Sequence, residues 1–381
     1  MNDGPKVGIV GAQRGMSLIA GFRAHGAEVT SLCARSEDFL NSQADRFDVP
    51  ERYTDYRAML ESEVDIVFVA TPMHLHVPHS LHALEAGKHV ISEVTAAVSV
   101  DQCRELVDGV EAARDAGVVY MLGENACFSP KNILIKNLVQ EGLFGDIYYA
   151  EGEYIHDIKP IHYGEDGSGT WRTVWQVGVN GCTYGTHSLG PILDWFDERV
   201  ASVMCLGTGV HTSPENKAED TTTMLCKLDS GALVRIRVDM LSNRPHGSGY
   251  SSLQGTTGCY EGPRGLGDQD KIWLERFGSE STTRETIDTD PYQWRPLSDL
   301  EAEYLPARWT EIPASVHGPD YGAGEYHMIG EFLEAIREQR DPALDVYRAV
   351  DMTLPGLLSQ ISIERGGEPI QMPDFRAGSW S

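Results

Sequence analysis

The chain has 381 residues and a formal net charge of −26, with 41% hydrophobic and 23% charged residues. This length suits two domains with separate cores, and no apolar run reaches the roughly 18 residues of a membrane-spanning helix. The negative charge repels nucleic acid and anionic lipid and disfavours strongly anionic substrates.

Cysteine usage and the N-terminus predict a cytoplasmic protein. The seven cysteines form no CxxC pair, so we expect free thiols in a reducing compartment. The first apolar stretch, residues 7–10, lacks the cationic lead and cleavage site of a signal peptide, and we expect the mature chain to start at or near Met1. Asp157, Asp194 and Asp220 show no metal-ligand spacing with histidines, and we predict no metal site.

The first third of the sequence alternates short apolar runs with amphipathic segments. We predict strands at residues 6–11, 28–33, 64–70, 89–92 and 118–122, and helices at residues 16–25, 36–47, 79–86 and 100–116. Such alternation is typical of a parallel, doubly wound sheet, because parallel strands need helical crossovers. Residues 1–124 are therefore predicted to form an α/β Rossmann domain that binds a dinucleotide.

Beyond Phe128 the pattern changes to successive strands joined by polar turns. We predict strands at residues 147–155, 200–206, 221–228, 233–240 and 369–373, and helices at residues 325–337 and 346–363. Residues 262–270 and 282–305 are predicted to be surface loops, and the tail after Phe375 to be disordered. Residues 125–381 are thus predicted to form an α+β domain with a largely antiparallel open sheet, which commonly buries its face in a homo-oligomer.

A glycine-rich turn follows the first predicted strand. Gly8, Gly11 and Gly15 would let the backbone approach a pyrophosphate. The run from Gly11 to Gly15 is one residue shorter than GxGxxG and lacks its middle glycine. Its position between a strand and a helix favours a phosphate-binding turn that includes Gln13 and Arg14, rather than an ordinary strand–helix turn.

The end of the second predicted strand bears on the choice of cofactor. NAD-binding domains commonly carry an acidic residue there for the ribose 2′-hydroxyl, but this chain has Ala34, Arg35 and Ser36. Arg35 and Ser36 suit the 2′-phosphate of NADP. Alternatively, Arg35 stacks on adenine and NAD is held by other contacts, so both cofactors stay open.

Two runs and one further residue lie around the third and fourth predicted strands. The run Thr71-Pro72-Met73-His74-Leu75-His76 follows the third strand, the run Ala83-Leu84-Glu85-Ala86-Gly87-Lys88-His89-Val90 leads into the fourth, and Glu93 follows the fourth. Together they resemble the Gfo/Idh/MocA oxidoreductase family. The resemblance implies that the Thr71-Pro72 turn and Glu93 lie by the nicotinamide and ribose, and it makes His76 and Glu124 candidates for the same site. The family's Glu-Lys-Pro triplet is Glu-Val-Thr here, so the lysine that assists proton transfer is absent.

Further runs occur in order downstream: Glu124-Asn125-Ala126-Cys127, Tyr154-Ile155-His156-Asp157, Trp171-Arg172, Asn180-Gly181, the run from Tyr184 to Pro191, Tyr250-Ser251 and His317-Gly318. Together they resemble the glycoside hydrolase family 109 branch over nearly the whole chain. Departures are Ala126, Phe128, the short glycine loop, Thr95 and Gly185.

This resemblance implies a glycoside hydrolase with a tightly bound NAD or NADP that is recycled. C3 of the sugar is oxidised by hydride transfer, which acidifies the C2 proton. The C1 substituent is then eliminated, water adds, and the ketone is reduced again, so that no net redox occurs.

Four residues are candidate bases for this chemistry. His187 is the first candidate for the C3 hydroxyl proton, because an imidazole titrates near neutrality. Tyr154 and His156 lie two apart on a predicted strand and share one face. Tyr184 lies three residues before His187, within reach through a helical turn. The structural alternatives are a core histidine, packed aromatic rings and a surface histidine.

Five residues are candidates for substrate binding. Arg172 would hold a hydroxyl or acetamido oxygen, and Trp171 would cover an apolar sugar face. A loop salt bridge is the alternative for Arg172. Tyr250, His317 and Asn125 are assigned by the resemblance.

Three functions fit these observations. The first is the redox-neutral glycosidase, the second a sugar or polyol dehydrogenase with net hydride transfer, and the third a non-catalytic dinucleotide sensor. Val94 in place of the lysine and the Tyr154-x-His156-Asp157 run favour the glycosidase.

Overall fold

The computed structural model describes residues 4–11, 14–247, 249–277, 294–316 and 322–377. The chain forms two compact units, one of residues 1–129, 309–357 and 373–381, the other of residues 130–308 and 358–372. The first unit thus also includes two segments from the C-terminal third of the sequence.

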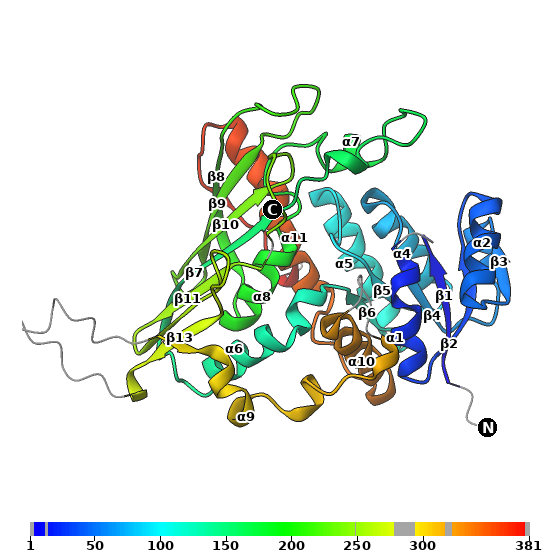
Figure 1. Cartoon of the computed structure of the whole chain (residues 1–381). Coiled ribbons are helices and arrows are strands. Elements are labelled where there is room, and N and C mark those ends of the chain that lie inside the picture. The colour runs from blue at the N-terminus through cyan, green and yellow to red at the C-terminus, as the bar shows by residue number, and fades with distance from the viewer. Residues whose placement is uncertain (1–3, 12–13, 248, 278–293, 317–321, 378–381) are drawn as a thin grey trace, which may run out of the picture. The chain divides into compact units, whose positions relative to one another are not determined.

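A six-stranded parallel sheet forms the centre of the first unit, with the order β3-β2-β1-β4-β5-β6 (Figure 1). Its strands are β1 (Lys6–Val10), β2 (Glu28–Cys33), β3 (Glu51–Tyr53), β4 (Ile66–Val69), β5 (His89–Ser92) and β6 (Tyr120–Leu122). The direction of the strand order reverses between β1 and β4. In a sheet of this type, ligands bind beside this reversal, at the carboxyl ends of the strands.

Helices flank this sheet in chain order. They are α1 (Ile19–Ala24), α2 (Glu37–Phe47), α3 (Tyr56–Leu60), α4 (His76–Glu85), α5 (Val100–Arg114), α10 (Ala323–Glu338) and α11 (Val346–Glu364), whose last residues belong to the second unit. Short 3-10 helices occur at η1 (Gly15–Leu18), η2 (Met73–Leu75) and η3 (Asn125–Phe128). Helix α10 contacts α1 and η3, which brings a distant segment of sequence next to the turn after β1.

A nine-stranded sheet forms the second unit, with the order β14-β13-β12-β11-β7-β10-β9-β8-β15. Its strands are β7 (Ile147–Ile155), β8 (Val200–Gly207), β9 (Thr221–Leu228), β10 (Leu233–Asp239), β11 (Ser251–Gly255), β12 (Gly258–Glu261), β13 (Lys271–Leu274), β14 (Arg295–Pro296) and β15 (Ile370–Gln371). Every adjacent pair except β7 and β10 is antiparallel. The predicted fold class, α/β followed by α+β with a largely antiparallel sheet, is confirmed.

One face of this sheet is covered by helix α8 (Thr186–Phe196), on which α6 (Pro130–Gln140) packs (Figure 1). Small residues on β7 allow the helix to come close. A Cβ atom added to Gly152 would lie 3.1 Å from side-chain atoms of Ser188 and Ile192. The N-terminal turn of α8 is therefore held directly against β7.

Two sequence predictions need correction. Part of the predicted loop 282–305 is structured, because β14, a 3-10 helix (Leu297–Leu300) and α9 (Glu301–Tyr304) lie in it, whereas residues 282–293 fall outside the described residues. The tail after Phe375 begins with a 3-10 helix to residue 377, and Arg376 forms an ion pair with Asp351 at 2.7 Å. That ion pair gives the start of the tail a fixed partner.

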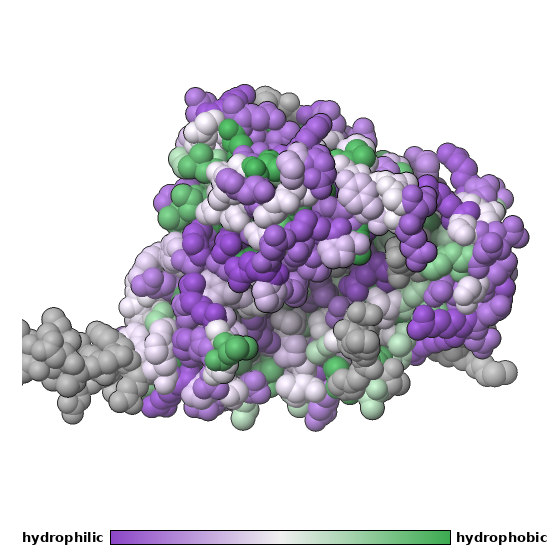
Figure 2. All heavy atoms as spheres, turned by 45° about the horizontal axis from the view of Figure 1, so that its top comes forward, coloured by the Kyte–Doolittle hydropathy of each residue, from purple (hydrophilic) through white to green (hydrophobic). Residues whose placement is uncertain are grey.

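Several elements were not predicted from the sequence, among them β3, α3, α6, α8, β11, β12 and β13. All seven cysteines are free, and all except Cys259 are buried. Within the described part of the chain, no helix has the length and apolar character needed to cross a membrane. Hydrophilic residues predominate on the face shown in Figure 2, in keeping with the large net charge.

The close contact between β7 and α8 can be tested with Gly152→Val. The added methyl groups collide with Ser188 and Ile192, and overpacking of this kind costs about 1–3 kcal/mol. We expect a lower urea midpoint for Gly152→Val and an unchanged midpoint for Gly265→Ala, whose Cβ would meet no atom within 4 Å. Equal midpoints for Gly152→Val and the unaltered protein would show that α8 does not depend on this contact.

Candidate active site

The turn after β1 has no room for side chains where it adjoins β1 and β4. Gly11 has a φ of 95°, and a Cβ atom there would lie 2.3 Å from the carbonyl oxygen of Ala70. A Cβ atom on Gly15 would lie 2.4 Å from Ile9. Glycine at these positions gives the close backbone approach that a dinucleotide-binding turn requires, so the turn fits the predicted cofactor despite its short length. Gly8 lies within β1, and Gln13 is outside the described residues.

Arg14 connects this turn to two carboxylates. Its Nε atom donates a hydrogen bond to Glu93 Oε1 at 2.9 Å, and its Nη2 atom lies 3.6 Å from Glu325 Oε1. Asn125 Nδ2 donates to the same oxygen of Glu325 at 2.8 Å. The Glu93 and Glu325 side chains are only 11% and 10% exposed, so one guanidinium balances two largely buried acids.

Glu325 was not a sequence candidate. It lies 200 residues beyond Asn125, and only the packing of α10 against η3 brings the two together. Its other oxygen, Oε2, accepts a hydrogen bond from the backbone N–H of Gly322 at 3.0 Å and so caps α10. A Gly-x-x-Glu sequence before an amphipathic helix signals such a cap, but not a partner for Arg14.

His76 organises the turn after β4. The side chain is buried, its Nε2 lies 2.8 Å from the carbonyl oxygen of Thr71, and its Nδ1 lies 2.7 Å from that of Thr95. Burial is the main cause that lowers the pKa of His76, and these two carbonyls and Glu93 oppose it. His76 thus ties the Thr71-Pro72 turn to the segment after Glu93, where the family resemblance places the nicotinamide.

The remaining predicted cofactor residues lie at helix starts or strand ends. Ser36 caps α2, with its Oγ accepting from the N–H of Phe39 at 3.4 Å. Glu124 is fully buried and accepts a hydrogen bond from the N–H of Ala126 at 3.1 Å. Arg35 is exposed just beyond β2 and therefore free to reach a ligand.

The choice between NAD and NADP can be tested with Arg35→Ala. If the guanidinium pairs with a 2′-phosphate, the variant loses a charge-assisted contact, and we expect its Kd for NADPH to rise about tenfold with that for NADH nearly unchanged. Fluorescence titration of both cofactors measures this, with Arg46→Ala as the control. Equal weakening of both would instead assign Arg35 to the adenine.

In the second unit, aromatic and imidazole rings gather around Tyr154. Its hydroxyl lies 3.0 Å from His156 Nδ1. The His187 ring stacks on the Tyr154 ring at 5.4 Å between centroids, and the Tyr184 ring meets it edge-on at 5.2 Å. His246 completes the group at 6.1 Å. We call these five residues the Tyr154 cluster.

The local fold explains this arrangement. Positions 152 and 154 of β7 share a face, and Gly152 packs on α8, so Tyr154 points to the side on which α8 lies. Because α8 begins at Thr186, its first turn carries His187 next to Tyr154, with Tyr184 just before the helix. The four predicted catalytic residues are therefore brought together, whereas nothing in the sequence pattern predicted His246.

Arg172 and Trp171 lie at the start of the short helix α7 (Arg172–Trp175). The Arg172 guanidinium carbon sits 4.5 Å from the centre of the Trp171 ring. Burial lowers the pKa of Arg172, and the hydroxyls of Tyr184 and Tyr154 partly oppose this. Among the described residues, Arg172 forms no ion pair, so its guanidinium is available to an acceptor atom of a ligand.

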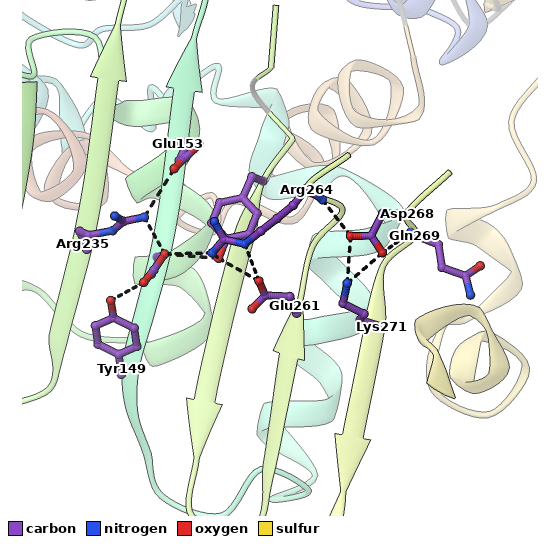
Figure 3. A network of polar contacts seen from close by, with 10 residues as sticks. Tyr149, Glu153, Arg235, Glu261, Arg264, Asp268, Gln269 and Lys271 are labelled. Carbon is purple, nitrogen blue, oxygen red and sulfur yellow. Dashed lines mark hydrogen bonds and ion pairs between the residues drawn. The ribbon is translucent and has the colours of Figure 1, made fainter. Parts of the chain in front are cut away.

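Tyr250 is not part of the Tyr154 cluster. Its hydroxyl lies 3.3 Å from both Glu151 and Glu261, and Arg264 lies 3.8 Å above its ring. Glu151 also pairs with Arg235 at 2.6 Å. Arg235, Glu261 and Arg264 belong to the polar network of Figure 3. Because Glu151 and Tyr154 are three residues apart on β7, they point to opposite faces of the sheet.

Two further predictions concern His317 and the absence of a metal site. His317 lies outside the described residues. Among the residues that are described, no group of three or more His, Cys, Asp or Glu side chains is arranged to hold a metal ion.

Three family models match the chain. Residues 5–124 match the oxidoreductase family with an NAD-binding Rossmann fold, residues 133–261 the GFO/IDH/MocA C-terminal domain, and residues 210–381 the C-terminal domain of glycosyl hydrolase 109. The chain belongs to the Gfo/Idh/MocA oxidoreductase family. The first match confirms the predicted nicotinamide cofactor domain, and the last matches the predicted family 109 branch.

Two named relatives show the same resemblance along most of their length. A glycosyl hydrolase family 109 protein of Saccharopolyspora erythraea is 29% identical, and the alignment covers 98% of this chain and 84% of that protein. An α-N-acetylgalactosaminidase of Shewanella oneidensis is 27% identical over 98% of this chain and 86% of the enzyme.

Solved structures share the fold of this chain. An oxidoreductase domain protein from Kribbella flavida superimposes with a TM-score of 0.79 at 20% identity, covering 97% of this chain and 99% of that one. Levoglucosan dehydrogenase in complex with NADH and levoglucosan gives a TM-score of 0.76 at 19% identity, covering 97% and 100%.

Proposed function

We propose that this Gfo/Idh/MocA family member is a redox-neutral glycoside hydrolase that retains NAD or NADP. The observation that carries the proposal is the Tyr154 cluster, in which a phenol is hydrogen-bonded to one imidazole and stacked on another. This group of bases belongs to a chain that has a dinucleotide-binding domain but lacks the lysine of the dehydrogenase triplet. The matches to glycosyl hydrolase 109 support the same proposal.

The first unit would hold the cofactor. The backbone of the glycine turn would face the pyrophosphate, Arg35 and Ser36 the adenosine ribose, and the Thr71-Pro72 turn and Glu93 the nicotinamide. When bound, the nicotinamide supplies a reversible acceptor for the hydride from C3 of the sugar. His76 and Arg14 position these contacts through the hydrogen bonds of Thr71 and Glu93.

The Tyr154 cluster would move the protons. His187 takes the proton of the C3 hydroxyl as that carbon is oxidised, since a neutral imidazole can accept a proton near pH 7. Tyr154, coupled through its hydroxyl to His156, takes the C2 proton, which the adjacent C3 ketone makes acidic. Tyr184 orients the sugar through its hydroxyl. Arg172 binds a sugar oxygen or an acetamido oxygen, with Trp171 beneath it.

The proposal predicts cleavage of glycosides without net reduction of the cofactor. The purified protein, with no cofactor added, is incubated with nitrophenyl α- and β-glycosides that include N-acetylgalactosaminides. We expect release of nitrophenol with no lasting absorbance from reduced nicotinamide. Stoichiometric NAD(P)H with free sugars and no glycoside cleavage would instead make the protein a sugar dehydrogenase.

The role of His187 is tested by His187→Ala. Loss of a positioned general base typically costs about 10²–10⁴-fold in rate, so we expect kcat to fall by that amount while cofactor binding stays intact. His211→Ala removes an exposed histidine that contacts Thr208 outside the cluster and serves as the control. Undiminished turnover of His187→Ala would remove His187 from the mechanism.

A further inference from the structure

We propose that His246 completes a proton relay that runs from Tyr154 through His156 to solvent. The inference rests on the proposed function, because it concerns the proton that Tyr154 takes from C2 of the sugar. It adds a residue that neither the family resemblance nor the sequence pattern assigns.

The three rings lie next to one another in the order Tyr154, His156, His246. Tyr154 Oη lies 3.0 Å from His156 Nδ1, which leaves Nε2 as the free nitrogen of that imidazole. The His246 ring meets the His156 ring at 4.3 Å between centroids, with an interplanar angle of 68°. Tyr154 and His156 are half-buried, whereas His246 is exposed. The path therefore leads from a partly shielded phenol to an imidazole in water.

The backbone holds both histidines at one place in the fold. The N–H of His156 donates to the carbonyl oxygen of Asp239 at 2.8 Å. Gly247, next to His246, exchanges both backbone hydrogen bonds with Ile155, next to His156, at 2.8 and 3.3 Å. These paired bonds fix the register of the two segments, because they join Gly247 to Ile155 in both directions. His246 and His156, which stand next to these two residues in the chain, are therefore held close together.

The buried carboxylate of Asp239 shapes the segment that leads to His246. Its side chain is 1% exposed and accepts hydrogen bonds from Thr221 Oγ1 at 2.6 Å and from Ser242 Oγ at 2.5 Å. It also accepts from the backbone N–H groups of Leu241 and Ser242 at 3.3 and 2.9 Å. Asp239 is thus a positioning residue, since its carboxylate fixes residues 241 and 242 before His246 and its backbone carbonyl accepts from the N–H of His156.

The proton balance of the relay is closed. When the C2–H bond breaks, its electron pair forms the C1=C2 bond and the leaving group departs with the C1–O electron pair. The C2 proton passes to Tyr154 as the phenol proton moves to His156 Nδ1, and His156 releases its Nε2 proton to His246 and water. When water adds to C1, the same path runs in reverse and returns one proton to C2.

The charges around His156 favour its role as an acceptor. Burial is the main cause that lowers its pKa, and His246, Arg172 and His187 lower it further, while Asp157 opposes them. The imidazole is therefore neutral near pH 7, with Nδ1 ready to accept the phenol proton.

The relay is tested with His246→Ala and, as a matched control, His211→Ala. In D₂O, wild-type protein should place deuterium at C2 of the product sugar. We expect His246→Ala to slow both cleavage and C2 labelling about tenfold or more, and added imidazole to restore the rates in a concentration-dependent way. A purely structural loss would not respond to imidazole.

Each outcome decides one claim. Wild-type rates in His246→Ala, or a loss that imidazole does not restore, overturn the relay and leave the hydrolase standing. Cleavage without C2 labelling in the wild type overturns the relay to solvent and leaves the hydrolase standing, whereas absence of both cleavage and C2 labelling overturns the proposed function and the relay with it. An NMR titration gives an independent readout, because removal of His246 should raise the pKa of His156 if the two rings interact as described.

Discussion

The close approach of α8 to β7 is the contact on which the candidate catalytic groups depend. Gly152 leaves space for Ser188 and Ile192, so the helix begins directly beside the strand. That geometry stacks the ring of His187 on the ring of Tyr154, while the Tyr154 hydroxyl lies within hydrogen-bond distance of His156. A proton-transfer group made of a phenol and imidazoles needs this fixed spacing, since proton transfer falls off steeply beyond hydrogen-bond distance.

The first unit would hold a pyrophosphate near several acids in a strongly acidic protein. Arg14 stands in the turn and neutralises Glu93 and Glu325 at once. Without it, two largely buried carboxylates would stand close to the phosphates of a dinucleotide, which is unfavourable. The short glycine turn therefore works together with a helix, α10, that lies far away in the sequence.

Periodicity predicted most of the fold, and motifs predicted most of the candidate site. The strand pattern of residues 147–155 placed Tyr154 and His156 on one face, and the spacing of Tyr184 and His187 placed them one turn apart. Neither periodicity nor motifs predicted His246 or Glu325, because the place of each residue in the site depends on contacts between segments far apart in the chain. Tyr250 shows the opposite case, in which a motif suggested a site residue whose hydroxyl contacts Glu151 and Glu261 and lies outside the Tyr154 cluster.

A nitrophenyl glycoside that carries deuterium at C3 tests the proposed transient oxidation most directly. A transient oxidation at C3 predicts that this substrate is cleaved more slowly than the unlabelled one and that the released sugar keeps its deuterium at C3. Equal cleavage rates together with no reduced nicotinamide formed during a single turnover would contradict oxidation at C3, and deuterium found in released NAD(P)H would show a dehydrogenase with net hydride transfer.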